Sequence, residues 1–204
     1  MGGPRGNTDD PRPRIASLVP SLTELLVELG LAHLKGRRAP RVLDLGTGSG
    51  ALGLALAAER PDAAVDLVDA SAAALAMAER NRAALGLGNV RLERGEWFAP
   101  LAGRRYDLIV SNPPYVAACD PRLELLRHEP PLALVAGPTG LEALSAIVAG
   151  ASAHLVPGGR LLLEHGAEQG ESVRRLLRAA GFGAIESRAD LAGHERATGG
   201  TRGD

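Results

Sequence analysis

Residues 106–115 read Tyr-Asp-Leu-Ile-Val-Ser-Asn-Pro-Pro-Tyr and join an apolar run to a stiff loop. The apolar run predicts a short buried strand, and ligands in α/β proteins bind where such strands end. Two consecutive prolines fix their own φ angles and push the residue before each of them into extended geometry. The loop therefore presents the Asn112 side chain and the Pro113 carbonyl as fixed acceptors, with Tyr115 beside them as a flat wall. Such a site suits a planar group that carries an NH2.

The composition indicates one domain and few kinds of partner. The chain has 204 residues, enough to bury a core, and a net charge of −1, which disfavours nucleic acid as a partner but does not exclude it. No apolar stretch approaches the roughly 20 residues of a membrane span, and the N-terminus lacks the apolar core of a signal peptide. The single cysteine, Cys119, has no partner at metal-ligand spacing. We therefore expect a cytoplasmic monomer without a metal.

Strands and helices alternate along the chain after a polar arm at residues 1–14, which we expect to be disordered. The first helix should start at the capping box Ser21–Glu24 and end at Gly30 or Gly36. We then expect strands at 41–45, 64–69, 90–94, 106–111, 160–164 and 184–188, and helices at 51–59, 72–85, 141–155 and 173–180. This alternation predicts a mainly parallel twisted sheet with helices on both faces.

The domain limits follow from the same pattern. Residues 15–198 should form a single domain, and the proline-rich stretch 116–138 is a candidate substrate loop. Glycines near the C-terminus weaken a possible strand at 195–204, so we expect residues 199–204 to form a flexible tail.

A glycine-rich turn, Gly46-Thr47-Gly48-Ser49-Gly50, lies between the first of these strands and the following helix. Glycine lets the backbone approach a ligand, and a helix N-terminus offers unpaired N–H groups. With Ala51 the turn also satisfies Gly-x-Gly-x-x-Ala, so a dinucleotide fold must be weighed. Asp44, at the end of the strand, would repel a pyrophosphate but attract an ammonium or a sulfonium. The ligand should therefore carry positive charge.

Acids also follow the next two strands. Asp69 ends the second strand about 20 residues after the turn, where a carboxylate can bind both ribose hydroxyls. Its position equally allows a helix N-terminal acid near Ser71. Glu96 follows the third strand and could accept an adenine amino proton while Trp97 lies against the ring, although a lone tryptophan is usually core. The five histidines are scattered, and His165, at a strand end, is the most notable. They indicate neither a catalytic pair nor a metal centre.

Together these motifs resemble the class I S-adenosylmethionine-dependent methyltransferases. They resemble more closely the protein-(glutamine-N5) methyltransferases that act on peptide chain release factors. The resemblance covers about residues 40–196 and rests on Asp44–Gly50, Asp69, Trp97-Phe98, Asn112–Tyr115, Glu129-Pro130, Ala133-Leu134, Leu163–Gly166 and Glu195-Arg196. It implies a Rossmann-like fold with an antiparallel last strand, S-adenosylmethionine as cofactor and a release factor as protein substrate.

The resemblance also assigns roles to residues. It implies that the cofactor is bound by Asp44, Gly46, Thr47, Gly48, Ser49, Gly50, Asp69, Glu96, Trp97 and Asn112. It implies that the catalytic residues are Asn112, Pro113, Pro114 and Tyr115. The sequence departs from the family at Glu96, where Asp is usual, and at Val19–Glu24, where only Thr-Glu of a Pro-Arg-Pro-Glu/Asp-Thr-Glu segment is kept. About 40 residues precede the first strand, where the family usually has a helical domain.

Other functions stay open at this point. An N-methyltransferase of nucleobase amino groups in RNA or DNA shares the Asn-Pro-Pro-Tyr tetrapeptide, although the charge and the scarcity of aromatic residues count against it. A cofactor-binding interaction module without activity is the alternative from another class. A nicotinamide dehydrogenase is disfavoured, because Asp44 would repel the pyrophosphate of its cofactor and because a set of residues suited to hydride transfer is missing.

Overall fold

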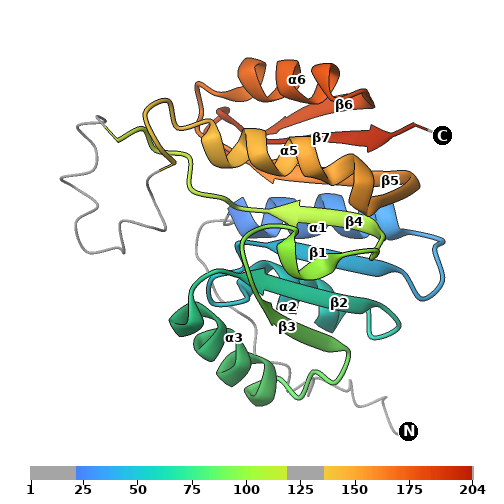
Figure 1. The fold of residues 1–204 in the computed structure, drawn as a ribbon. Coiled ribbons are helices and arrows are strands. Elements are labelled where there is room, and N and C mark those ends of the chain that lie inside the picture. Colours follow the sequence, from blue (N-terminus) through green and yellow to red (C-terminus); the bar gives the residue numbers. More distant parts are fainter. Residues whose placement is uncertain (1–21, 119–135, 204) are drawn as a thin grey trace, which may run out of the picture.

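A seven-stranded sheet in the order β3-β2-β1-β4-β5-β7-β6 organises the structure (Figure 1). The computed structural model describes residues 22–118 and 136–203. The strands are β1 (Arg41–Leu45), β2 (Ala64–Asp69), β3 (Val90–Arg94), β4 (Tyr106–Ser111), β5 (Leu155–Glu164), β6 (Phe182–Ala189) and β7 (Glu195–Arg202). The helices are α1 (Leu22–Leu34), α2 (Ala51–Glu59), α3 (Ala72–Ala84), the 3-10 turn η1 (Ala99–Leu101), α5 (Glu142–His154) and α6 (Gly170–Ala179).

The first five strands are parallel, and β7 is antiparallel to both β5 and β6. This confirms the predicted mainly parallel sheet with an antiparallel last strand. The chain runs outward from β1 to β3 and returns at β4, which pairs with the other side of β1. The strand order therefore reverses between β1 and β4, and ligands of open α/β sheets bind at the carboxyl ends of the strands at such a point.

Two apolar cores cover the two faces of the sheet, as strands buried on both faces require. Side chains from α1 and α2 form one core with Val42, Leu67 and Leu108, and side chains from α5 and α6 form the other with Leu43 and Ile109. In Figure 1, α1 lies behind the sheet and α5 in front of it. None of the helices within residues 22–118 and 136–203 is long and apolar enough to cross a lipid bilayer.

The C-terminal residues correct one expectation. The flexible tail expected at 199–204 is wrong for residues 199–202, which belong to β7. A Cβ atom built at Gly199 would lie 2.4 Å from Leu162 Cδ2, and one at Gly200 would lie 2.9 Å from Phe182 Cβ. Glycine is thus what lets β7 fit between its neighbours, because a larger residue at either position would collide with the adjacent strand.

Helix α1 passes through Gly30 and ends at Leu34, just before the left-handed Gly36, so of the two predicted ends Gly36 is confirmed and Gly30 is not. A Cβ atom at Gly30 would lie 3.0 Å from Leu108 Cδ2, so glycine allows this helix to approach the sheet closely. The predicted cap at Ser21, the arm at 1–14, Cys119 and most of the candidate substrate loop lie outside the described residues. The single-domain limits 15–198 stay a prediction.

Candidate functional site

The glycine-rich turn between β1 and α2 has a backbone that only glycine adopts easily. Gly46, Gly48 and Gly50 have φ angles of 67°, 57° and 84°. The N–H groups of Gly46 and Thr47 both donate to the carbonyl of Val68, at 2.9 and 3.1 Å, which fastens the turn to the end of β2. A Cβ atom built at Gly48 would have no atom within 4 Å, so a ligand can approach the backbone there.

Asp44 lies beneath this turn, with only 1% of its surface exposed. Its Oδ2 atom accepts hydrogen bonds from the Thr47 hydroxyl at 2.6 Å and from the Gly53 N–H at 2.9 Å. Burial raises the pKa of Asp44 to about 6, and the negative charge of nearby Asp69 adds to the rise, against the effect of the two hydrogen bonds. Asp44 therefore holds the turn in shape, and near neutral pH it also places a negative charge below it.

Asp69 connects the same turn to the start of α3. Its Oδ2 accepts the Gly48 N–H at 2.9 Å, and its Oδ1 accepts the Ser71 N–H at 2.8 Å. The carboxylate thus accepts N–H groups from the glycine turn and from Ser71 before α3, which fits the acid near a helix N-terminus that the sequence allowed. Each carboxylate oxygen keeps a further lone pair for a ligand. Contact with ribose hydroxyls stays a prediction.

Trp97 follows β3 and lies against the turn. Its φ angle of 45° is unusual for a residue other than glycine. A Cβ atom built at Gly46 would lie 3.5 Å from Trp97 Cζ3, and Trp97 is a partly buried residue that packs against the core formed with α5 and α6. The neighbouring Glu96 is exposed. The structure thus brings the tryptophan to the glycine turn, and its contact with an adenine ring stays a prediction.

The Asn-Pro-Pro-Tyr loop begins beside the same turn. Ser111 pairs with Leu45, and its hydroxyl donates a 2.6 Å hydrogen bond to the Leu45 carbonyl. The next residue on β1 is Gly46 and the next on β4 is Asn112, so the turn and the loop leave the sheet side by side. Asn112 is exposed, and its side chain makes no hydrogen bond within the described part of the chain. Its carboxamide is thus available to a ligand.

Tyr115 forms one wall of a groove of about 430 Å³. The groove lies between the loop after β4 and the start of α6, and Thr139, Gly166, Gln169, Ser172 and Arg196 are among its lining residues. A second cavity, of about 420 Å³, opens at the amino-terminal ends of β1, β2 and β3 beside Asn89. We assign function to the first, because only it borders the carboxyl ends of the strands and the Asn-Pro-Pro-Tyr loop.

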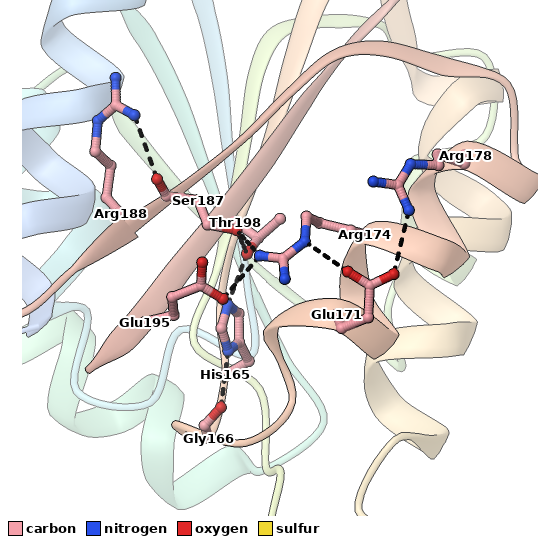
Figure 2. Close-up of polar contacts among 9 residues, drawn as sticks. All are labelled: His165, Gly166, Glu171, Arg174, Arg178, Ser187, Arg188, Glu195 and Thr198. Atoms are coloured by element: carbon pink, nitrogen blue, oxygen red, sulfur yellow. Dashed lines mark hydrogen bonds and ion pairs between the residues drawn. The ribbon is translucent and has the colours of Figure 1, made fainter. Parts of the chain in front are cut away.

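His165 is buried in a directional hydrogen-bond network (Figure 2). Its Nδ1 lies 2.9 Å from the Gly166 carbonyl, which can only accept, so Nδ1 carries the proton. Nε2 then accepts from the Thr198 hydroxyl at 2.7 Å, and Thr198 in turn lies 2.9 Å from Ser187, which accepts from Arg174. Burial lowers the pKa of His165. We therefore interpret His165 as a neutral, structural histidine.

Several supporting residues were missed from the sequence. Gly53 braces Asp44, the Asn81 side chain donates to the Ser49 carbonyl at 2.9 Å, and Gln169 donates to the Tyr115 carbonyl at 3.0 Å. A glycine within the helical run 51–59 was a signal for Gly53, whereas Asn81 and Gln169 carry no sequence signal. Within residues 22–118 and 136–203, no cluster of three or more His, Cys, Asp or Glu side chains could hold a metal ion.

Comparison with known proteins identifies the family. Residues 23–190 match the family described as Methyltransferase small domain. The release factor glutamine methyltransferase of Xylella fastidiosa (strain Temecula1) is 53% identical over 186 residues, which are 90% of this chain and 68% of that protein. The protein of the same name from Escherichia coli K12 is 44% identical, over 90% of this chain and 67% of its own length.

Solved structures agree on the fold. The 16S rRNA N2 G1207 methyltransferase RsmC of Thermus thermophilus matches with a TM-score of 0.67 and 24% identity, over 95% of this chain and 45% of that one. The ribosomal protein L11 methylase of Lactobacillus delbrueckii subsp. bulgaricus matches with a TM-score of 0.62 and 21% identity, over 89% of this chain and 79% of that one. The predicted class I methyltransferase fold is thus confirmed. This chain belongs to the release factor glutamine methyltransferase family, and its residues 23–190 match a methyltransferase small domain.

Proposed function

We propose that this chain transfers a methyl group from S-adenosylmethionine to N5 of the glutamine in the Gly-Gly-Gln motif of a peptide chain release factor. The names of its relatives support the protein substrate. The observation that carries the chemistry is the position of Asn112. This exposed residue directly follows β4, next to the glycine turn that directly follows β1. A methyl donor on the turn and an amide held by Asn112 would then be neighbours.

The residues at this edge fit S-adenosylmethionine. The open backbone at Gly48 would receive it, the Asp69 carboxylate lies beside that backbone for the ribose, and Trp97 supplies a flat surface. Asp44 supplies a buried negative charge, which favours a cationic ligand. We assign the cofactor to Asp44, Gly46, Thr47, Gly48, Ser49, Gly50, Asp69, Glu96, Trp97 and Asn112.

S-adenosylmethionine, when bound, would supply a methyl group activated on a sulfonium. Its transfer to the amide nitrogen would break the sulfur–carbon bond, leave the neutral thioether S-adenosylhomocysteine and release one N–H proton to solvent. The protein's task is orientation, because the lone pair of an amide nitrogen is delocalised into its carbonyl. The Asn112 side-chain oxygen and the Pro113 carbonyl would each accept one N–H of the glutamine amide. Pro114 keeps the loop stiff, and the Tyr115 ring would pack on the amide plane. Such alignment can contribute several kcal/mol.

This chemistry needs no strong general base. The methyl donor is already cationic and its charge is dispersed during transfer, so the residues have only to favour the transition state by position. This agrees with the neutral, structural state of His165.

The groove beside Tyr115 supports a protein substrate. It continues from the proposed acceptor site and is lined by hydrogen-bonding groups of Thr139, Gln169, Ser172 and Arg196. We assign it to the peptide segment that flanks the acceptor glutamine.

Because release factors act on the ribosome, we place the chain in the cytoplasm. Because the proposed site residues lie in one chain, we propose a monomer.

A labelling assay tests the proposal. The purified protein is incubated with S-adenosylmethionine labelled in its methyl group and with a release factor, with deproteinised RNA or with DNA, and cofactor binding is measured by calorimetry in the same preparation. Label in the release factor alone is the expected result. Label in nucleic acid would assign the chain to nucleobase methylation, and cofactor binding without label would identify an inactive binding module.

A further inference from the structure

Glu164 is a buried acid next to the proposed acceptor site. It is the last residue of β5, directly after Leu163, which pairs with Ser111 at the end of β4. Only 3% of its surface is exposed. Oε1 accepts a 3.3 Å hydrogen bond from the Tyr115 hydroxyl, whereas the buried Oε2 has no partner among the residues described. A carboxyl group placed in this way costs stability, because its desolvation is only partly compensated.

Packing alone does not account for this acid. The three residues before Glu164 on β5 are leucines, each at most 1% exposed. An apolar residue at 164 would continue that pattern, and replacing buried charged groups by apolar ones often stabilises a protein. The contact that distinguishes a carboxyl at this position is the one to Tyr115, which points to a role in the loop after β4.

Tyr115 is held at several points. Its carbonyl accepts a 3.0 Å hydrogen bond from Gln169 Nε2, and its ring packs on the core beneath α5. Gln169 also donates to the Gly140 carbonyl at 3.2 Å and accepts the Gly166 N–H at 2.9 Å. The backbone of Tyr115 is therefore fixed by Gln169, and the tip of its ring is fixed by Glu164.

We propose that Glu164 is a positioning residue for the methyl acceptor, which acts by holding the Tyr115 ring through its hydroxyl group. The inference rests on the proposed function, in which that ring packs on the plane of the acceptor amide. Loss of the contact leaves the glycine turn untouched but lets the ring move, so it should impair orientation of the acceptor and spare the cofactor.

The charge of Glu164 adds a second, independent readout. Burial raises the pKa of Glu164 to about 7, while the Tyr115 hydrogen bond and the charge of Arg196 on β7 act in the opposite direction. Arg196 itself is paired with Asp190 at 3.2 Å, and the adjacent His165 is neutral. A carboxylate binds a hydroxyl more strongly than a carboxylic acid does. The hold on Tyr115 should therefore tighten as pH rises through about 7 and loosen as pH falls.

The test is a double-mutant cycle with the release factor as acceptor, at saturating S-adenosylmethionine. Glu164→Leu and Tyr115→Phe are each expected to lower kcat/KM for the release factor about tenfold, mainly in kcat, and to leave the cofactor Kd within about twofold. The double variant should be no slower than Tyr115→Phe alone, since the two changes remove one contact. Glu59→Leu, at an exposed glutamate of α2, serves as the matched control.

Glu164→Gln keeps an oxygen acceptor but removes the titration, so it covers the case in which the leucine variant fails to fold. Wild-type kcat/KM should rise between about pH 6 and pH 8, and the glutamine variant should show no such step. Multiplicative losses in the double variant, a cofactor Kd that weakens as much as kcat/KM, or a pH step that persists in Glu164→Gln would each overturn the inference alone. Wild-type protein that leaves the release factor unmethylated would overturn the proposed function and this inference with it.

Discussion

The Ser111 hydroxyl donates a 2.6 Å hydrogen bond to the Leu45 carbonyl, which joins the ends of β4 and β1 immediately before the Asn-Pro-Pro-Tyr loop and the glycine turn. Ser111 is fully buried. Together with the pairing of β1 and β4, the contact holds the segment assigned to the amide next to the segment assigned to the methyl donor. In this way a single side chain couples two halves of the proposed site.

Ser111→Ala should lower both stability and activity. The loss of a buried hydrogen bond should reduce the free energy of unfolding by about 1 kcal/mol, measured by urea titration, and the looser junction should lower kcat. Ser145→Ala, at a half-buried serine of α5, is the matched control. A variant with wild-type kcat would show that the junction does not set the alignment.

Cofactor affinity should depend on the ionisation of Asp44. Because burial raises the pKa of this acid to about 6, it is largely ionised at pH 8 and largely neutral at pH 5. Binding of a cationic ligand should therefore weaken as pH falls through about 6. Titration followed by Trp97 fluorescence measures the Kd, and Asp44→Asn should bind more weakly at pH 8 and vary little with pH. The same pH dependence in both proteins would assign it to another group.

Helix α2 approaches the sheet so closely that Gly53 has no room for a side chain. A Cβ atom there would lie 2.1 Å from Leu67 Cδ2 and 3.0 Å from Asp44 Cβ. Gly53→Ala should reduce the free energy of unfolding by about 1–3 kcal/mol, as overpacking does. Gly88→Ala, where a built Cβ meets nothing within 4 Å, should differ little from wild type. Equal stabilities of the two variants in urea would contradict the proposed fit.

A large side chain in the groove beside Tyr115 should obstruct the protein substrate. Ser172→Trp is expected to raise KM for the release factor about tenfold and to change kcat and the cofactor Kd little, because only uniform binding of the substrate is lost. Ala179→Trp, on the exposed end of the same helix, is the matched control. An unchanged KM in Ser172→Trp would remove the groove from the substrate path.

Much of the fold could be predicted from the sequence, because parallel strands buried on both faces leave apolar runs that are bounded by turns. β1 and β4, for example, have the expected bounds. The continuation of β7 through residues 199–202 could not, since glycine is a poor strand former and is accepted there only for lack of space beside Leu162 and Phe182. That lack of space arises from neighbours distant in the sequence.

The site was predictable in part for a related reason. Its main candidates follow strand ends, where a motif can be read directly, as at Asn112 and Gly46–Gly50. Glu164 also ends a strand, but its burial and its bond to Tyr115 depend on a loop about 50 residues earlier in the chain. Supporting contacts of this kind, like that between Gln169 and the Tyr115 carbonyl, become visible only when the sheet brings the strand ends together.

The most direct test of the account is to locate the transferred methyl group. After incubation of wild-type protein and Asn112→Ala with S-adenosylmethionine and a release factor, tandem mass spectrometry of the Gly-Gly-Gln peptide shows which atom is modified and how fast. We predict one methyl group on the glutamine side-chain nitrogen with wild-type protein, and a rate at least about 100-fold lower in the folded variant at saturating S-adenosylmethionine. A methyl group on any other atom, or an equal rate in the variant, would contradict the account.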